Sequence, residues 1–465
     1  MCERCFCVIL KAAFQHNAIS PSRFAKGGFV CAAGSNTRYS MTDTTDLKKQ
    51  IAEGTYDIYF DKLYGDAWRA FQKQRYTEVI EGFEKRFGEA NVAVFSAPGR
   101  TEICGNHTDH QNGRVITAAV DLDVVAVVAM SDDDTVRMYS EGYDETVVKV
   151  TDTDINIGEY GTTKALIKGM VAASKARGYK TGGFTAYVRG GVPGGSGLSS
   201  SAAFEVLTGT IINGLFNDFS IDPETIAVMG REAENRYFGK PCGLMDQMGC
   251  SVGGMIKIDL ADPDNAVVQK IVTDITSFGY SLCIVDTKGS HADLTGEYAA
   301  VFEEMQSVAK YFGKNLLGET DEELFKSNIA ALRDAVGDRA VLRALHWYNE
   351  NRRVDRMAEA LKAGDIDGFL VCVKESGDSS YRFLQNVYAV KNPKEQAVAL
   401  ALAFSEEILG DNGICRVHGG GFAGTIQAFV KNSAVADYKE RIEVIFGEGS
   451  CYVLKIRSVG GIMMK

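Results

Sequence analysis

The sequence predicts a fold that mixes helices and strands and is divided into two or three domains. The chain has 465 residues, of which 45% are apolar and 24% charged, a composition typical of a globular protein with a large core. Strand and helix patterns share the first part of the chain, residues 297–375 have mostly charged, amphipathic helical patterns, and strand patterns return near the C-terminus. This change of character places a domain boundary between residues 245 and 290. We set it at residue 250, between domains 41–250 and 251–465.

Two predicted strands flank a polar loop early in the chain. Ala93–Ser96 has the pattern of a short strand that enters this loop, and Asp121–Met130 has that of a buried strand that leaves it. The apolar run Val124–Met130 is the longest candidate for a membrane span, yet it is far shorter than the roughly 18 residues that a spanning helix needs. We therefore expect no contact with a membrane.

The remaining elements follow from periodicity and turn residues. Helical patterns occupy Ala165–Arg177, Ser199–Phe216 and Glu224–Tyr237, the last with Pro223 near its start. Strand patterns occupy Phe184–Val188, Met255–Leu260, Ser281–Asp286, Thr425–Val430 and Cys451–Arg457.

Residues 1–40 look unlike the rest of the chain, and Met41 begins a polar stretch, M-T-D-T-T-D, that is typical of a protein start. The C-x-x-C-x-C spacing at Cys2–Cys7 could bind zinc, but no second paired cluster follows. We expect residues 1–40 to be a disordered leader or a wrongly assigned start. The odd total of 11 cysteines, with no secretory signal, indicates reduced thiols and a cytoplasmic protein.

The net charge of -11 and the lack of clustered Lys and Arg in the sequence argue against a nucleic-acid partner. An acidic chain can still bind phosphate groups, because local N–H donors matter more than the total charge.

Two of the six histidines lie three residues apart in A-P-G-R-T-E-I-C-G-N-H-T-D-H, Ala97–His110, with Asp109 between them. By themselves, these residues are compatible with a metal site, a sugar site or a loop that is merely polar.

A glycine-rich stretch, G-G-V-P-G-G-S-G-L-S-S-S-A-A, joins the strand pattern at 184–188 to the helical pattern that starts at Ser199. Glycines let the backbone curl with its N–H groups inward, and a helix N-terminus adds unpaired donors that suit a polyphosphate. The stretch is not a Walker loop, because no Gly-Lys-Ser/Thr follows, and it does not match the dinucleotide pattern. A flexible turn is the alternative, although three hydroxyls at a helix start favour a ligand.

Asp246 lies among apolar residues in E-A-E-N-R-Y-F-G-K-P-C-G-L-M-D-Q-M-G, where a carboxylate is costly unless it has a partner. It is therefore a site candidate, with a helix cap or a buried ion pair as the alternative. Glu234, in the same stretch, would by itself be a solvated helix residue. A third cluster, R-V-H-G-G-G-F-A-G-T, precedes a strand, and its three consecutive glycines indicate either close backbone approach or a turn.

Together these stretches resemble the galactokinases of the GHMP small-molecule kinase superfamily. The stretch Ala97–His110 is similar to the galactokinase signature G-R-x-N-L-I-G-E-H-T-D-Y, the stretch P-G-G-S-G-L-S-S-S-A-A to the nucleotide loop, and H-G-G-G-F-A-G-T to G-G-G-F-G-G-C. The segment around Asp246 and R-A-L-H-W-Y-N-E-N-R-R-V also match the family. The similarity runs from about residue 55 to the end, with the motifs in the expected order.

The resemblance implies a two-domain α+β GHMP kinase fold with the active site in the cleft between the domains, and ATP-dependent phosphorylation of the C1 hydroxyl of galactose. It implies the partners ATP, Mg²⁺ and a small sugar, in a monomer or weak oligomer. The implied ATP-binding residues are Gly195, Ser196, Gly197, Leu198, Ser199, Ser200 and Ser201, the magnesium ligands Ser201 and Glu234, the catalytic residues Asp246 and Arg100, and the sugar-binding residues Asn106, His107, Thr108, Asp109 and Tyr298.

The chemistry of these residues agrees with the resemblance. Arg100 beside Asp246 would lower the pKa of the acid and keep it ionised, so that it can accept the proton of the attacking hydroxyl. Asp109 offers two acceptors that read the orientation of adjacent hydroxyls. We therefore expect His107 and Asp109 to hold a sugar rather than a metal, since no nearby cluster offers a third ligand.

The chain departs from the family pattern at several positions. Asn106 stands where the family has Glu, which reaches the C6 region of the sugar, and His110 stands where it has Tyr; the other departures are Thr101–Glu102 for Val-Asn, Ala423 for Gly and Gly377 for His. A carboxylate at position 106 would repel a sugar with its own C6 carboxylate by about 1–4 kcal/mol at about 4 Å. Asn106 removes that repulsion, and the loop also resembles galacturonokinases, so galacturonate is an alternative substrate.

Two further alternatives concern the class of protein. Some galactokinase-like sensors bind ATP and galactose without catalysis, but the intact S-S-S-A-A, with Arg100, Glu234 and Asp246 all present, favours an enzyme. A superfamily kinase of mevalonate or homoserine is disfavoured by the H-T-D sugar motif.

Overall fold

The apolar run near residue 125 forms the end of β3 (Arg114–Met130), the strand on which the larger of two sheets is built. The structure is a computed structural model that describes residues 41–289 and 294–465, so the predicted leader and its cysteines lie outside the described residues. Val124 and Val125 belong to different buried clusters, because successive side chains of a strand point to opposite faces. Both faces of β3 are buried, which explains why its sequence is apolar without alternation.

The larger sheet contains nine of the described strands. They pair in the order β1-β2-β3-β6-β4-β5, with β13 on β2, β7 on β3 and β8 on β7, and only β4 and β6 among them pair in parallel. Besides β3, they are β1 (Thr42–Asp43), β2 (Asn91–Cys104), β4 (Thr135–Ser140), β5 (Thr146–Lys149), β6 (Phe184–Gly190), β7 (Met255–Asp259), β8 (Val267–Ile271) and β13 (Ile462–Met464). The domain boundary at residue 250 stays a prediction, and this sheet also takes three strands from beyond it.

The smaller sheet is antiparallel, with the order β10-β11-β9-β12. Its strands are β9 (Tyr280–Asp286), β10 (Gly413–Val417), β11 (Thr425–Lys431) and β12 (Cys451–Leu454). The third glycine cluster of the sequence is the turn between β10 and β11, so it precedes a strand as predicted.

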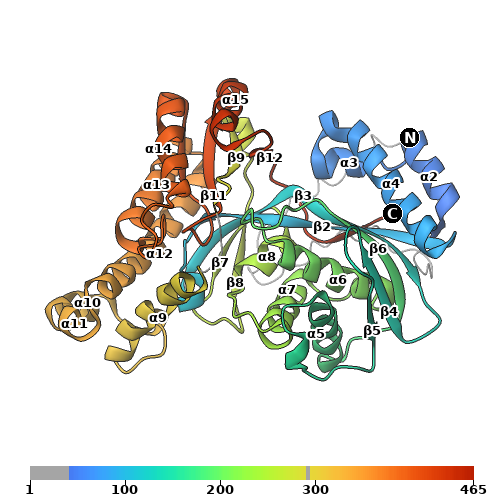
Figure 1. Cartoon of the computed structure of the whole chain (residues 1–465), viewed down its shortest axis with the longest axis horizontal. Helices are drawn as coiled ribbons and strands as arrows, with labels where there is room; N and C mark the ends of the chain where they lie inside the picture. Colours follow the sequence, from blue (N-terminus) through green and yellow to red (C-terminus); the bar gives the residue numbers. More distant parts are fainter. Residues whose placement is uncertain (1–40, 290–293) are drawn as a thin grey trace, which may run out of the picture. The chain divides into compact units, whose positions relative to one another are not determined.

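Helices cover both faces of the larger sheet (Figure 1). One face packs against α5 (Thr163–Ala176), α6 (Ser200–Phe216), α7 (Pro223–Glu232) and α8 (Met245–Val252), and the other against α2 (Thr44–Glu53), α3 (Asp57–Tyr64) and α4 (Arg69–Phe87). The later helices are α9 (Thr295–Tyr311), α10 (Glu322–Ser327), α11 (Ile329–Val336), α12 (Asp338–Ala363), α13 (Ile366–Ser379), α14 (Ala397–Leu409) and α15 (Val435–Phe446). In the parts of the chain that are described, no helix is both long and apolar enough to cross a membrane.

The predicted strands and helices are present, with two differences that affect the site. The predicted entry strand at 93–96 is part of β2, which continues through Cys104, so half of the expected polar loop is a buried strand. The predicted helix 224–237 divides into α7 and a π-helical turn, Ala233–Phe238, that carries Glu234. The helices α2 to α4 were not predicted from the sequence.

A buried ion cluster joins the N-terminal helices to the sheet and to the C-terminal segment. Asp123 of β3 and Arg457 have no exposed side-chain surface, and Arg75 of α4 donates to Asp123 at 2.7 Å. Tyr64 of α3 also donates to Asp123, at 2.5 Å. Burial alone would raise the pKa of Asp123, but the two arginines keep it below its ordinary value.

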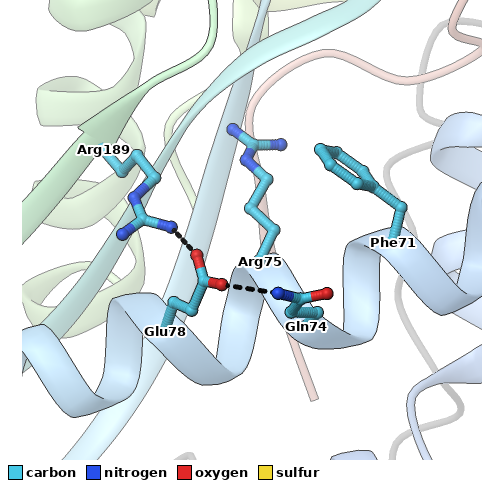
Figure 2. A pocket seen from close by; sticks show the side chains of 5 residues that line it. All are labelled: Phe71, Gln74, Arg75, Glu78 and Arg189. Carbon is cyan, nitrogen blue, oxygen red and sulfur yellow. Dashed lines mark hydrogen bonds and ion pairs between the residues drawn. The ribbon is translucent and has the colours of Figure 1, made fainter.

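A cavity of about 300 Å³ lies beside this cluster, between α4 and the end of β6 (Figure 2). Phe71, Gln74, Arg75, Glu78 and Arg189 line it, and Glu78 accepts from both Arg189 and Gln74. None of these five residues is one of those predicted to bind sugar or ATP.

We predict that Asp123→Asn lowers the free energy of unfolding by about 3–5 kcal/mol, because it leaves two buried guanidinium groups without a counter-charge. Urea unfolding at pH 7 measures this loss. The matched control is Asp133→Asn. The Asp133 carboxylate pairs with Arg137 at the surface, so its loss should change the free energy of unfolding little. Equal losses in the two variants would contradict the prediction.

Candidate active site

Arg100 and Asp246, predicted as catalytic residues, are in direct contact. Arg100 projects from β2 and donates through Nε to Asp246 Oδ1 at 2.8 Å, while its Nη2 lies 2.6 Å from Oδ2. Asp246 lies in the first turn of α8, and Ser199 also donates to it. Burial by itself would raise the pKa of Asp246, but the charge of Arg100 and these hydrogen bonds keep it below its ordinary value. The carboxylate is therefore ionised, and 26% of its side-chain surface is exposed.

The glycine-rich stretch forms a tight loop between β6 and α6 (Figure 1). Gly195, Gly197 and Ser199 have left-handed backbones, with φ of 76°, 71° and 60°. The carbonyl of Gly197 accepts from the Arg100 guanidinium, and that of Leu198 accepts from the Arg100 backbone N–H at 3.0 Å. The loop is thus tied to β2 through its carbonyls.

The N-terminus of α6 has no side-chain cap. Ser199 occupies the capping position, but its hydroxyl is turned toward Asp246. The first N–H groups of the helix therefore keep no side-chain partner and carry the partial positive charge that attracts phosphate. Ser200 is exposed, whereas Ser196 and Leu198 are buried and support the loop from beneath.

Ser201 and Glu234, predicted as magnesium ligands, lie 3.2 Å apart between Oγ and Oε1. Glu234 is buried, with 1% exposure, which overturns the expectation of a solvated helix residue that its sequence position alone suggested. Lys240 donates to it at 2.9 Å and Gln247 at 2.8 Å. The π-helical turn directs this carboxylate inward.

The loop after β2, which we call the sugar loop (residues 105–113), has an unusual backbone. His107 and Asn112 are left-handed, with φ of 57° and 59°. Thr108 has no exposed surface, and its hydroxyl lies 2.9 Å from the carbonyl oxygen of Gly105 and 2.6 Å from that of Arg114, either of which can accept its one proton. Its hydroxyl thus closes the loop on itself.

Asp109 follows in a single 3₁₀ turn, partly exposed. A Cβ at Gly243 would lie 1.9 Å from Asp109 Oδ2, so only glycine allows this approach to the segment that leads into α8. Burial, and then the negative charges of Asp246 and Glu102, raise the pKa of Asp109 to about 7. Asp109 therefore lies against the segment that leads into α8, the helix that carries Asp246.

The two histidines of the sugar loop face each other. His107 Nδ1 lies 3.3 Å from His110 Nε2, and His107 Nε2 lies 3.0 Å from the carbonyl of Gly420. A carbonyl only accepts, so this network assigns the proton of His107 to Nε2. Burial lowers the pKa of His107 to about 4 and that of His110 to about 3, so both are neutral at pH 7. Within residues 41–289 and 294–465, no group of three or more His, Cys, Asp or Glu is placed to hold a metal ion.

Asn106 is fully buried and is bonded to protein on both sides of its amide. Its Nδ2 donates to the two oxygens of Glu102 at 3.2 Å and to the carbonyl of Gly419 at 2.6 Å, and its Oδ1 accepts from Asn386 at 2.8 Å. Glu102 in turn pairs with Arg416 at 2.5 Å.

Motif comparison did not identify Glu102 as a site residue, although the comparison contained a signal for it. The signature motif has Asn at position 102 and Glu at 106, whereas this chain has Glu102 and Asn106. These are two departures from the motif, and the structure places Glu102 and Asn106 in contact as an amide–carboxylate pair.

The glycine turn between β10 and β11 connects the other segments. His418 lies 3.0 Å from Thr101 and 2.9 Å from Thr425, which donates to the carbonyl of Ser196 at 3.1 Å. Tyr298, near the start of α9, donates to the carbonyl of Gly421 at 2.9 Å. Through this turn, the smaller sheet joins the sugar loop to the glycine-rich loop between β6 and α6.

The comparisons with known proteins agree with this arrangement. Residues 81–130 match the family model described as the galactokinase galactose-binding signature, and residues 165–254 match that of the GHMP kinases N terminal domain. A galactokinase of Lactobacillus helveticus is 30% identical over 385 residues, which cover 81% of this chain and 95% of that protein.

Solved structures show the same fold. The galactokinase of Lactococcus lactis in complex with galactose superposes with a TM-score of 0.70 and 25% identity, covering 82% of this chain and 98% of that one. A mevalonate kinase from Methanococcus jannaschii shares the fold, with a TM-score of 0.56 and 15% identity over 78% of this chain and 98% of that one. The predicted α+β GHMP kinase fold is confirmed, and the chain belongs to the galactokinase family.

Proposed function

We propose that this protein transfers the terminal phosphoryl group of ATP to the C1 hydroxyl of galactose. The observation that carries the proposal is the contact of Arg100 with both Asp246 and the nucleotide loop. One ionised acid thereby lies where the sugar loop and the phosphate-binding helix end meet. The galactose-binding signature and the galactokinase relatives favour galactose over galacturonate.

Positioning of the sugar is assigned to Asp109 and His107. The partly exposed Asp109 carboxylate accepts hydrogen bonds from two adjacent sugar hydroxyls. The neutral imidazole ring of His107 lies in the same loop. We propose that Asn106 and Thr108 act through the shape of the sugar loop, since both are buried and bonded within the protein. Tyr298 adds an aromatic wall next to the glycine turn.

Asp246 accepts the proton of the C1 hydroxyl as its oxygen bonds to the terminal phosphorus. The bond from that phosphorus to the bridging oxygen breaks, and ADP leaves with the electron pair. Arg100 keeps Asp246 ionised before the reaction and offers positive charge near the transferring group. Alignment of the two substrates contributes most to the rate enhancement, because phosphoryl transfer needs little covalent participation by the protein.

The phosphates of ATP are assigned to residues 195–201, over the uncapped start of α6. Ser201 and Glu234 fit Mg²⁺, because they are hard oxygen donors and their 3.2 Å separation is close to the roughly 3 Å between neighbouring ligands of an octahedral ion. When bound, Mg²⁺ would neutralise phosphate charge. Lys240, whose side chain is 60% exposed, can move away from Glu234.

A cytoplasmic monomer or weak oligomer is part of the proposal. The seven cysteines among the described residues are all free, which supports a reducing compartment where ATP is abundant.

The central test is sugar-dependent release of ADP with galactose, galacturonate, N-acetylgalactosamine and glucose as acceptors. We expect turnover with galactose and little with glucose, since Asp109 reads hydroxyl orientation. Asp246→Asn should lower kcat by at least about 100-fold while both substrates still bind.

The matched control is Asp264→Asn, an acid whose side chain is 89% exposed and which should retain full activity. Binding of galactose and ATP without ADP release by the wild-type protein would instead support a sensor.

We predict that Ser201→Ala raises the Mg²⁺ concentration for half-maximal activity about tenfold, the effect of losing one charge-assisted contact. Titration of Mg²⁺ at saturating galactose and ATP measures it. Ser220→Ala, at an exposed position after α6, is the control, and an unchanged Mg²⁺ requirement in Ser201→Ala would remove this serine from the metal site.

We predict that the affinity for galactose rises about tenfold between pH 6 and pH 8, the ratio of ionised fractions for a pKa near 7. The pKa of Asp109 is raised above its ordinary value, so the carboxyl group is largely protonated below pH 7. In that form it accepts hydrogen bonds from sugar hydroxyls poorly. Calorimetric binding of galactose across this range provides the measurement.

The same shift predicts the sign of a stability effect. Protonated Asp109 is favoured in the folded protein, so its contribution to stability is lost progressively as the pH rises from about 4 to about 7. Asp109→Asn should therefore raise Tm more at pH 8 than at pH 5 while it abolishes the pH dependence of binding. A larger gain at pH 5 would contradict the assignment.

A further inference from the structure

The sugar loop has a backbone that its own sequence does not favour. His107 and Asn112 are left-handed without being glycine, which costs conformational free energy at each position. Within the loop, the side chain of Thr108 bonds to backbone carbonyls and His107 contacts His110. A loop of this kind keeps one shape only if contacts from elsewhere stabilise it.

Helix α12 provides such contacts from one face. His346, Trp347, Glu350 and Asn351 are spaced so that they share a side of the helix. Each bonds a different backbone group at the sugar loop, and these bonds are His346 Nε2 to the Asn106 carbonyl at 2.9 Å, Trp347 Nε1 to the Thr108 carbonyl at 3.3 Å, the Gly105 N–H to Glu350 at 3.1 Å and the Arg114 N–H to Asn351 at 2.6 Å.

Glu350 is the most highly bonded of the four. Its carboxylate has no exposed surface and accepts from the Gly105 N–H, from the Cys104 thiol at 3.4 Å and from Ser376 at 2.5 Å, and it pairs with Arg353. Burial alone would raise its pKa, but Arg353, His346 and Arg416 lower it to about 2. The group is thus a fixed anion that binds the first residue of the sugar loop.

We propose that α12 holds the sugar loop in its galactose-binding shape and that Glu350 is the main positioning residue of this contact. The inference rests on the proposed function, because it assigns the loop to the sugar. Glu350 bonds the backbone of Gly105, whereas His107 and Asp109 present side chains to the ligand. Its loss should therefore weaken sugar binding and leave the nucleotide loop, which is tied to Arg100, unaffected.

The experiment compares KM for galactose and KM for ATP in the wild type, Glu350→Gln and Glu359→Gln. Glu350→Gln keeps the side-chain size but removes the charge, and losing a charge-assisted bond in a buried site should raise the KM for galactose by about tenfold or more. The KM for ATP should stay within about twofold. Glu359, exposed on the same helix, should give wild-type values for both.

Hydrogen exchange of the Gly105 amide gives a readout that needs no substrate. It should speed up in Glu350→Gln and not in Glu359→Gln. If the wild type fails to phosphorylate galactose, the proposed function fails while the exchange result still tests the contact of α12 with the loop.

Trp347→Phe covers the case in which Glu350→Gln does not fold. It keeps an aromatic ring and removes the N–H that binds the Thr108 carbonyl, so a smaller rise in KM for galactose alone is expected. Equal rises in KM for galactose and ATP, or no change in either variant, would overturn the proposal.

Discussion

The buried guanidinium of Arg100 is the interaction on which the site depends. It binds Asp246, 146 positions away in sequence, and the carbonyl of Gly197, 97 positions away. A charge this buried is unfavourable unless its donors are matched by acceptors. Because the acceptors come from the start of α8 and from the nucleotide loop, satisfying Arg100 requires that all three segments meet. The same contact that stabilises the fold therefore places Asp246 beside the loop that leads into α6.

Close backbone approach is the second constraint. Asp109 reaches the segment before α8 only because Gly243 has no Cβ, and a Cβ at Gly197 would lie 2.9 Å from the ring of His418. Backbone carbonyls of the glycine turn that carries His418 also accept hydrogen bonds from the side chains of Asn106 and Tyr298. Motifs separated in sequence thus bind one another largely through backbone groups, which explains why glycine and small residues are concentrated in them.

Two buried carboxylates behind the site have ion-pair partners. Glu102 pairs with Arg416, and Glu350 pairs with Arg353. Asp109 differs from these two acids, since no described residue forms an ion pair with it and its pKa is raised to about 7. An unpaired acid at this position costs stability and is available for hydroxyl donors. Acids with a shifted pKa that cost stability are expected where a protein binds a ligand.

The sequence by itself determined the family, the fold class and the identity of the central residues. Arg100, Asp246, Ser201 and Glu234 could be named in advance because the motifs around them are local and ordered. Periodicity located most strands and helices, since side-chain alternation depends only on neighbouring residues. Helices α2 to α4 were not predicted, and the length of β2 was underestimated, because their polar and apolar residues are arranged by packing against the sheet.

Only the tertiary structure decided how these residues are used. It showed that Glu234 is buried, that Glu102 and Asn106 are in contact, and that α12 bonds to the backbone of the sugar loop. The physical reason is that burial and hydrogen-bond partners come from other segments of the folded chain, some of them far away in sequence, as Glu350 is from Gly105. A local pattern specifies which groups are present, whereas the folded chain determines which of them remain open to a ligand.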